Sequence, residues 1–374
     1  MRALFFFGTL RHLPLLEIVL GRPADRLEIT AASLQNHGVY AVAEGPFPTI
    51  IAKKGMVADG IRVAGLSDED IARIDFYEGG FAYELIPVTL RDGQTAEMYF
   101  ASPDLWTPVM AWDLADWVAA YGPLSCYAAA EVMEYKGYKT ADQVAQMFPM
   151  IRSRAAARLN ASQSRHGAGT LYGEVDIIAV NRAYAAFFAL DDFTLRHQRF
   201  DGAMSDPVDR AVFIASDAAL VLPYDPVRDR VLLVEQLRMG PVARGDQAVW
   251  QLEPIAGRVD GGETPEEAAY REAMEEAGLS LKSLEPVAEV YASPGDSTEF
   301  YYIYLGIADL PDAVTGVCGV DAEDEDIRSH LLSFDDLMTL CDERRAANAP
   351  LVAAAYWLAR HRDRLRLGGG GYTP

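Results

Sequence analysis

One stretch of the chain, residues 257–279, constrains its fold more than any other. It reads GRVDGGETPEEAAYREAMEEAGL, a glycine-rich loop followed by the marks of a helix. Thr264 and Glu267 have the spacing of a capping box, and Pro265 occupies the first helical position, where its missing N–H does no harm. Gly278 can adopt the left-handed conformation that ends a helix. The stretch therefore predicts a helix that begins at about Pro265 and ends at Gly278.

The charges on this helix indicate metal chemistry. Glu272 and Glu276 are four residues apart and Glu275 is three residues from Glu272, so these carboxylates share adjacent faces of one turn. Their repulsion is relieved by solvent, by Arg271 or by a divalent cation, and oxygen ligands of this kind suit Mg²⁺ or Mn²⁺. A solvated acidic face is the ordinary interpretation of a glutamate-rich helix, and the flanking loop favours the metal site here.

Length and composition predict two domains in a soluble, cytoplasmic protein. The chain has 374 residues and a formal net charge of −22, which disfavours binding to nucleic acids and anionic membranes. Cys126, Cys318 and Cys341 are widely separated, which indicates buried thiols in a reducing cytoplasm and argues against disulfides and a zinc site. Arg11 and His12 interrupt the apolar N-terminus, so we expect no signal peptide, and no apolar run is long enough to span a membrane.

The first third of the chain predicts a small domain of mixed α+β character. Residues 3–7 form an apolar strand that ends in a tight loop, and residues 67–77 have the pattern of a helix. Residues 84–90 and 95–101 flank an Asp-Gly turn and predict a hairpin. The motifs FGTL, PFPTI and IDFYEGGFAYE within residues 1–105 resemble the gamma-glutamyl cyclotransferase-like fold, a small barrel.

This resemblance implies a first candidate site. Glu78 would act as general acid and base, because burial raises the pKa of a carboxyl group toward neutrality. In that family Tyr is frequent at the position of Phe7 and Leu at the position of Ile74. The alternative is a scaffold domain for binding or assembly, in which Glu78 caps a helix or forms an ion pair. The loop that would bind a gamma-glutamyl group through its backbone amides consists of Phe7, Gly8, Thr9 and Leu10.

Residues 106–169 predict a helical connector and linker. Amphipathic spacing around Trp117 indicates two or three helices whose aromatic residues pack in a core. Thr140, with Gln143 three residues later, marks one helix start. The polar segment 160–169 is the expected linker. Four basic side chains in this acidic protein are expected to pair with acidic groups of the same chain: Arg152, Arg154, Arg158 and Arg165.

The C-terminal half carries the second and stronger resemblance. Residues 257–279, here called the box, match the Nudix hydrolase signature, and the motifs FFAL, RHQ, FDG, LPYDP, VEQLR and SPG resemble its ADP-ribose pyrophosphatase branch. The resemblance implies an α/β/α sandwich with a mixed sheet over residues 170–365, followed by a flexible tail, 366–374. Strands are expected at 219–222 and 231–234, and a C-terminal helix at 351–361.

The branch implies hydrolysis of a nucleoside diphosphate sugar, ADP-ribose to AMP and ribose 5-phosphate, with Mg²⁺ or Mn²⁺. Arg238 would contact phosphate, and Glu299 would bind ribose hydroxyls beside aromatic rings that stack the adenine. Glu253 would serve the metals or bind substrate. His197 and His330 lack metal-ligand spacing and are expected to form hydrogen bonds only. The expected metal ligands are the carbonyl of Ala256 and the carboxylates of Glu272, Glu276 and Glu325.

The general base is expected outside the box, in the acidic loop 321–326. A run of carboxylates is ordinarily a solvated segment, but a loop that closes over the substrate can supply a base and exclude water. The resemblance makes Glu323 the base candidate and Glu325 a ligand of metal or water.

Other functions stay open at this point. One alternative is that the Nudix half senses a nucleotide without turnover, although an intact box argues against it. Another is that cyclotransferase activity of the first domain is the main function. Chains that join these two domains also resemble tellurite-resistance proteins, but the cysteines are not clustered for oxyanion reduction. The branch further implies a homodimer in which residues 196–213 cross to the partner copy.

Overall fold

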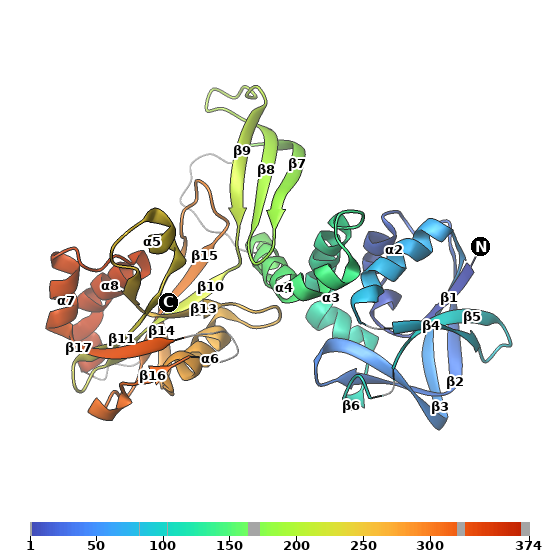
Figure 1. The fold of residues 1–374 in the computed structure, drawn as a ribbon, viewed down its shortest axis with the longest axis horizontal. Coiled ribbons are helices and arrows are strands. Elements are labelled where there is room, and N and C mark those ends of the chain that lie inside the picture. Colours follow the sequence, from blue (N-terminus) through green and yellow to red (C-terminus); the bar gives the residue numbers. More distant parts are fainter. Residues whose placement is uncertain (1, 82, 103, 164–172, 320–325, 368–374) are drawn as a thin grey trace. The chain divides into compact units, whose positions relative to one another are not determined.

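The computed structural model describes residues 2–81, 83–102, 104–163, 173–319 and 326–367. The chain divides into two compact units, Met1–His166 and Gly167–Pro374, and each is a mixture of helices and sheet (Figure 1). Among the described residues, none of the helices is both long enough and apolar enough to cross a membrane.

The first unit is built on a six-stranded sheet in the order β4-β5-β1-β3-β2-β6. The predicted strand, helix and hairpin of this region are confirmed as β1, α2 and the β4–β5 pair, and Ser67 and Asp70 form a capping box at the start of α2. The strands are β1 (Arg2–Phe6), β2 (Glu28–Val42), β3 (Gly45–Leu66), β4 (Tyr83–Thr89), β5 (Thr95–Ala101) and β6 (Pro108–Ala111). The helices are η1 (Thr9–Arg11), α1 (Leu13–Leu20), α2 (Asp68–Glu78), η2 (Gly79–Phe81), α3 (Leu114–Glu134) and α4 (Ala141–Gln163).

Helices α3 and α4 belong to this first unit, since α3 packs against α1 and α4 packs against α3 and η2. Thr140 and Gln143 cap the start of α4 with reciprocal hydrogen bonds, as predicted. The expected internal pairing of the basic side chains is confirmed for Arg154, whose Nη2 lies 2.5 Å from Glu131 Oε1 in a buried ion pair. Trp117 is buried, and its Nε1 donates to Pro46 O at 2.6 Å.

The second unit contains an antiparallel three-stranded sheet, β7-β8-β9, and an eight-stranded mixed sheet. Their strands are β7 (Val175–Ala185), β8 (Ala189–His197), β9 (Val208–Ile214), β10 (Ala218–Asp225), β11 (Arg230–Leu237), β12 (Trp250–Glu253), β13 (Ile255–Arg258), β14 (Ser283–Tyr291), β15 (Phe300–Ile307), β16 (Val317–Cys318) and β17 (Ile327–Ser333). The helices are α5 (Met239–Arg244), α6 (Pro265–Ala277), η3 (Asp312–Val314), α7 (Phe334–Asp342) and α8 (Ala349–Arg366).

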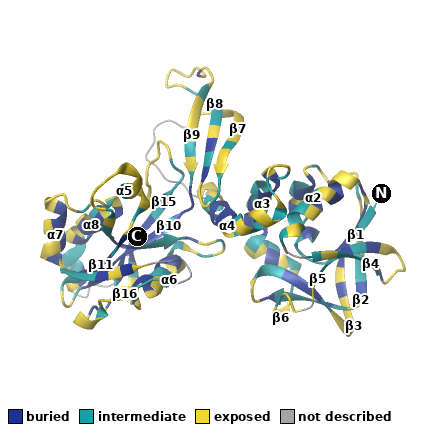
Figure 2. Cartoon of the chain, viewed as in Figure 1, coloured by how far each residue is buried: buried dark blue, intermediate teal, exposed yellow. Residues whose placement is uncertain are grey.

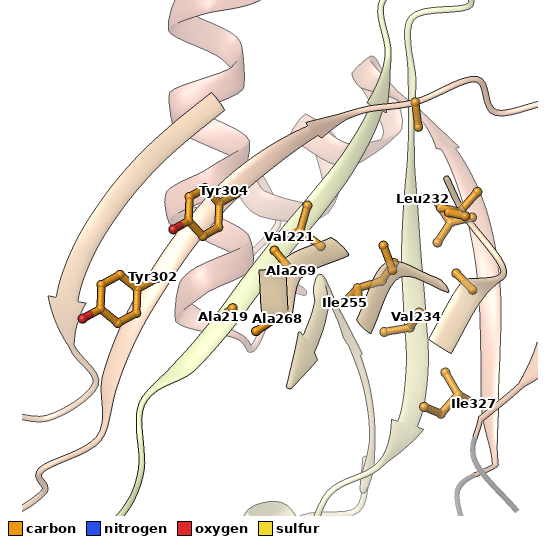
Figure 3. Packing of buried hydrophobic residues seen from close by; sticks show 14 of the residues in the cluster. Ala219, Val221, Leu232, Val234, Ile255, Ala268, Ala269, Tyr302, Tyr304 and Ile327 are labelled. Atoms are coloured by element: carbon orange, nitrogen blue, oxygen red, sulfur yellow. The ribbon is translucent and has the colours of Figure 1, made fainter. Parts of the chain in front are cut away.

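The eight-stranded sheet has helices on both faces, which confirms the predicted α/β fold. On one face Ala268 and Ala269 of α6 pack against Ala219 and Val221 of β10 (Figure 3). On the other face α7 and α8 cover the alternate residues of the same strands. Strand β10 is therefore almost wholly buried, whereas β7 and β9 are largely exposed (Figure 2).

One aspartate anchors the last helix to this sheet. Asp229, in the turn between β10 and β11, has a positive φ of 56° and accepts a hydrogen bond from Tyr224 OH at 2.7 Å. Arg362 and Arg366 of α8 both form ion pairs with its carboxylate. These arginines, Arg362 first, hold the pKa of Asp229 well below its usual range.

Candidate active site

The box folds as its sequence predicts. Helix α6 spans Pro265–Ala277, and Thr264 Oγ1 accepts a hydrogen bond from the backbone N–H of Glu267 at 3.2 Å. The Glu267 carboxylate in turn accepts from the N–H of Thr264 at 2.8 Å, which completes the capping box. Gly278 ends the helix with a left-handed φ of 61°. These caps fix where α6 begins and ends, and thereby where the box carboxylates lie along it.

Arg271 joins the loop of the box to its helix. Its Nε and Nη2 donate to the two carboxylate oxygens of Glu263 at 2.9 and 3.0 Å. Its Nη1 donates to Glu272 at 2.6 Å and to Glu275 at 2.9 Å, and Nη2 also donates to the carbonyl of Arg258 at 3.1 Å. A guanidinium has five N–H donors, so all of them are used inside the box. Arg271 therefore holds the loop against the helix and has no donor left for a ligand.

Glu272 lies directly on the backbone of β13 at Gly257. A Cβ placed on Gly257 would stand 1.7 Å from Glu272 Oε1 and 1.9 Å from its Cδ. Any side chain at this position would consequently displace the carboxylate. The glycine at the start of the box is thus required by the close approach of a helix carboxylate, and no positive φ is involved.

Glu276 is a buried carboxylate, with 3% of its surface exposed. Its Oε2 accepts a hydrogen bond from the backbone N–H of Ala256 at 3.2 Å, and Gln236 Nε2 lies 3.4 Å from its Oε1. Burial of a charged carboxylate is costly unless donors or a cation compensate it. Glu272 and Glu276 therefore flank the same short segment, Ala256–Gly257, one from each of two turns of α6.

This donor set suits a hard divalent cation, because it offers carboxylate oxygens beside a backbone carbonyl. Within the described ranges, no three histidine, cysteine, aspartate or glutamate side chains gather closely enough to hold a metal ion. Glu325, a further predicted ligand, and Glu323, the predicted base, both lie outside the described residues.

Two predicted substrate residues form a pair beside the box. Arg238 Nε donates to Glu253 Oε1 at 2.6 Å, and Asn348 Nδ2 donates to Glu253 Oε2 at 3.1 Å. Burial raises the pKa of Glu253, while the charge and hydrogen bond of Arg238 oppose the change. Among the described residues only the Nε of the Arg238 guanidinium has a hydrogen-bond partner, and 39% of the side chain is exposed, so its terminal N–H groups are available to a ligand.

Glu299 directly precedes β15, and its carboxylate is bound to a neighbour that the sequence reasoning missed. Tyr301 OH donates to Glu299 Oε2 at 3.0 Å. Burial and the charge of Glu299 raise the pKa of Tyr301 far above its ordinary value. Tyr301 is two residues after Glu299 on a strand, so the period of a strand places both side chains on one face. That spacing was a usable signal.

Aromatic rings lie next to the loop that precedes Glu299. The backbone N–H of Phe213 donates to Asp296 O at 2.8 Å, and the N–H of Thr298 donates to Phe213 O at 3.0 Å. The rings of Phe188 and Phe213 are 4.8 Å apart, and those of Phe187 and Phe188 are 4.7 Å apart. Sequence reasoning also missed Gln236 and Asn348, which reach Glu276 and Glu253 from distant elements and leave no local signal.

The two histidines form hydrogen bonds, as predicted. His330 Nε2 lies 2.8 Å from Glu235 Oε2 across β11 and β17, and His197 Nδ1 lies 3.2 Å from Gln198 O. Among the described residues, neither belongs to a group of three or more His, Cys, Asp or Glu side chains that could hold a metal ion.

In the first unit, Glu78 is the last residue of α2 and interacts electrostatically with three tyrosine side chains. Burial raises the pKa of this carboxyl group to about 7. The charge of Glu78 contributes to raising the pKa values of Tyr77, Tyr83 and Tyr99. A carboxyl group that titrates near neutrality can give and take a proton at ordinary pH.

The loop Phe7–Leu10 follows β1 as a tight turn. The N–H of Arg11 donates to Gly8 O at 3.1 Å, and that of His12 donates to Thr9 O at 3.0 Å. The Leu10 side chain is buried in the core, and a Cβ on Gly8 would lie 3.0 Å from Cγ of Pro48 in the PFPTI motif. The turn and that motif therefore pack together, as their joint resemblance to one fold implies.

Comparison with known families agrees with both halves. The NUDIX domain model matches residues 215–355, and the model described as gamma-glutamyl cyclotransferase, AIG2-like, matches residues 4–119.

Curated relatives match the Nudix part. The ADP-ribose pyrophosphatase of Escherichia coli (strain K12) is 41% identical over 193 residues, which cover 52% of this chain and 91% of the relative. That of Haemophilus influenzae is 35% identical over 187 residues, covering 50% and 86%. The GDP-mannose pyrophosphatase of Yersinia pestis is 29% identical over 175 residues, covering 47% and 86%. The chain therefore belongs to the Nudix hydrolases and carries a gamma-glutamyl cyclotransferase, AIG2-like domain ahead of its Nudix domain.

Proposed function

We propose that the Nudix half hydrolyses the diphosphate of nucleoside diphosphate sugars, with ADP-ribose as the preferred substrate and AMP and ribose 5-phosphate as products. The observation that carries the proposal is the pair of box carboxylates, with Glu272 lying on Gly257 and Glu276 buried against the N–H of Ala256. The substrate choice is supported by relatives named ADP-ribose pyrophosphatase at 41% and 35% identity.

Glu272, Glu276 and the carbonyl of Ala256 would hold Mg²⁺ or Mn²⁺, with Glu325 as a further proposed ligand. When bound, the cation supplies neutralisation of the diphosphate charge and Lewis acidity. Arg238 would orient the diphosphate through its terminal N–H groups, since its Nε is engaged with Glu253. Glu253 keeps this guanidinium in place, and Arg271 keeps the loop and helix at the distance that the two ligand carboxylates require.

Glu299 would accept hydrogen bonds from ribose hydroxyls. Tyr301 OH donates to one of its oxygens, which fixes the carboxylate and leaves acceptor capacity for the substrate. Glu323 is the proposed general base, which takes the proton of the attacking water. Glu323→Gln should lower kcat with little change in KM, whereas Glu325→Gln should also raise the metal concentration that half-saturates the rate. The reverse pattern would exchange the two roles.

The central test is Glu276→Gln. The exchange keeps the size of a buried side chain but removes a ligand charge, so we expect kcat for ADP-ribose to fall by at least about 1000-fold. Activity is measured by coupled phosphate release on ADP-ribose, ADP-glucose, GDP-mannose and UDP-glucose with Mg²⁺ or Mn²⁺. Glu343→Gln, at an exposed residue paired with Arg345, is the control. Full activity of Glu276→Gln would refute the proposal.

The Nudix half is also proposed to form a homodimer. The sheet β7-β8-β9 exposes a row of large apolar side chains, which a soluble monomer seldom leaves uncovered. Light scattering should give twice the 41.0 kDa subunit mass, and a monomer would contradict this proposal. The exposed side chains are Val175, Ile177, Ile178, Val180 and Tyr184 of β7, with Phe200 in the connection between β8 and β9.

The first unit carries a second candidate activity, cyclisation of a gamma-glutamyl group. The favouring observation is Glu78, whose pKa is raised to about 7 by burial. In this reaction the substrate α-amine attacks the gamma-carbonyl, and the products are 5-oxoproline and a free amine. Glu78 would take the amine proton and return it to the leaving group. We also propose that the protein is cytoplasmic. The three cysteines are free, which is consistent with a reducing compartment.

The test uses the full chain and a gamma-glutamyl dipeptide, with 5-oxoproline measured by chromatography. Glu78→Gln should abolish the product, and Glu276→Gln, in the other unit, should leave it unchanged. Absence of 5-oxoproline from the unaltered chain would exclude this activity for the substrate used, and retention of product by Glu78→Gln would remove Glu78 from the mechanism.

A further inference from the structure

Arg258 has hydrogen-bond donors that nothing in the described structure uses. It is the last residue of β13 and follows Gly257 directly. Its Nε is buried and has no hydrogen-bond partner among the described residues. Its Cζ lies 4.9 Å from the centroid of the Phe187 ring, a cation–π contact that orients the guanidinium. Such a contact satisfies none of the N–H groups in the guanidinium plane, and buried donors normally have partners.

Strand register places Arg258 on the face of the sheet that carries Tyr301, whose hydroxyl is bound to Glu299. Arg258 pairs with Ala218 across β13 and β10, and Ala218 pairs with Tyr301 across β10 and β15. Side chains paired in this way point to the same face, so Arg258 and Tyr301 stand on one face about two strand spacings, roughly 10 Å, apart. Gly257, against which Glu272 lies, is turned to the opposite face.

A cluster of aromatic rings begins beside Arg258. The ring of Phe187 is 49% exposed, and Phe188 packs edge-on against it. Phe213 continues the cluster to the loop that precedes Glu299. A planar ligand with a π-face and acceptor atoms along its edge fits rings bordered by a donor-only group. A nucleobase has this chemistry, whereas the diphosphate belongs beside Glu272 and Glu276.

We propose that Arg258 is a specificity-determining residue that donates hydrogen bonds to acceptor atoms of the substrate nucleobase. The inference rests on the proposed function and deepens it. The Phe187 ring positions the guanidinium, and the nucleobase accepts from the terminal N–H groups, because the buried Nε is out of reach of a ligand. Arg258 thereby adds binding energy to the nucleoside end of the substrate and takes no part in the chemistry at the diphosphate.

The test compares Arg258→Met with Arg258→Lys, and Arg345→Met is the matched control at an exposed arginine. Methionine keeps an unbranched apolar stem that reaches about as far as the arginine Nε and carries no N–H donor, while lysine keeps the charge but loses the planar set of donors. For Arg258→Met we expect KM for ADP-ribose to rise by about 10- to 100-fold with kcat within about threefold, because a hydrogen bond from a charged donor is lost. Arg258→Lys should fall between.

Binding and inhibition measurements with fragments of the substrate show which part of the substrate Arg258 contacts. AMP should bind Arg258→Met more weakly by the same factor, while pyrophosphate and ribose 5-phosphate, which lack a base, should bind as they do to the unaltered chain. Unchanged AMP affinity would overturn the proposal, and so would an equal loss for pyrophosphate or a fall in kcat alone. If the unaltered chain hydrolyses none of the nucleotide sugars, the proposed function fails, and calorimetric titration with AMP still decides the role of Arg258.

Discussion

Gly257→Ala gives the sharpest test of the metal-ligand geometry, because one methyl group acts on one carboxylate. The added Cβ would lie 1.7 Å from Glu272 Oε1, 1.9 Å from Cδ and 2.5 Å from Cγ. Ordinary van der Waals contact begins at 3.4 Å, so the carboxylate must retreat by about 1.7 Å. The atoms that clash belong to the end of a flexible side chain, and Gly257 has no positive φ. The strand itself can therefore accept alanine.

The expected result is a folded but nearly inactive protein. A misplacement of about 1 Å in a catalytic group can cost on the order of 100-fold in rate, so kcat/KM for ADP-ribose should fall by at least that factor. Stability should change little, by about 1 kcal/mol, since the main loss is the partly exposed Arg271–Glu272 ion pair. Rates come from coupled phosphate release and stability from denaturant unfolding.

Two comparisons decide whether Glu272 carries the effect. Gly316→Ala is the control, since a Cβ there meets nothing within 4 Å. Glu272→Gln alone should already lose most of the activity, so adding Gly257→Ala to it should cause almost no further loss. Wild-type rates in Gly257→Ala would refute the reasoning, and so would fully additive losses in the double variant.

Three further predictions concern stability and pH. Gly60→Ala should destabilise the first unit by about 1–3 kcal/mol in denaturant unfolding, because its Cβ would lie 2.4 Å from the carbonyl oxygen of Phe6, which cannot move aside as a side chain can; an unchanged midpoint would contradict this packing. The folded first unit holds the Glu78 proton more tightly than the unfolded chain, with a pKa of about 7 against an ordinary 4.5, so this stability contribution is complete below about pH 4.5 and is lost as pH rises toward 7. Melting curves of the wild-type chain should show this loss of stability with rising pH, and Glu78→Gln should remove it. If Glu78→Gln keeps the wild-type pH dependence, Glu78 is excluded as its source. Asp229→Asn should cost about 2 kcal/mol in unfolding of the second unit, since it weakens bonds to Arg362. The loss should shrink as pH falls below the ordinary aspartate range, because the unfolded wild-type chain takes up a proton at Asp229 there while the folded carboxylate, whose pKa is lowered, stays charged to a lower pH; a pH-independent difference would count against the ion pair.

The box was predictable because its determinants are local. Capping residues, a proline at the first helical position and a closing glycine lie within the segment they shape, and α6 has the predicted bounds. The strands at β10 and β11 were predictable for a similar reason, since they are continuous apolar runs buried on both faces. Their observed bounds extend beyond the expected cores by a few residues, as does α8 beyond 351–361.

The long hairpin of β2 and β3 was not predicted. Its burial pattern does not alternate, and the pairing shifts between Gln35 and His37. Gly55 adds a positive φ of 85° within β3. Such irregularities break the period of two on which strand prediction depends.

The candidate site was predictable where a motif supplies it and not where tertiary contacts do. Glu272 and Glu276 follow from spacing, but Gln236 and Asn348 come from separate elements and become neighbours only when the sheet and α8 assemble. Arg258 lies inside the box at a position that the signature leaves variable. Its significance follows from a ring some seventy residues earlier in the chain.

The full use of the hydrogen-bond donors of Arg271 bears on how related sequences should be compared. All five of its N–H groups are engaged, with three carboxylates and one carbonyl. Lysine offers three donors on a single atom and cannot span these acceptors. An alignment that scores lysine here as a conservative exchange would therefore count a disabled box as intact. Homologues with lysine at this position should be grouped with those that have lost a ligand carboxylate.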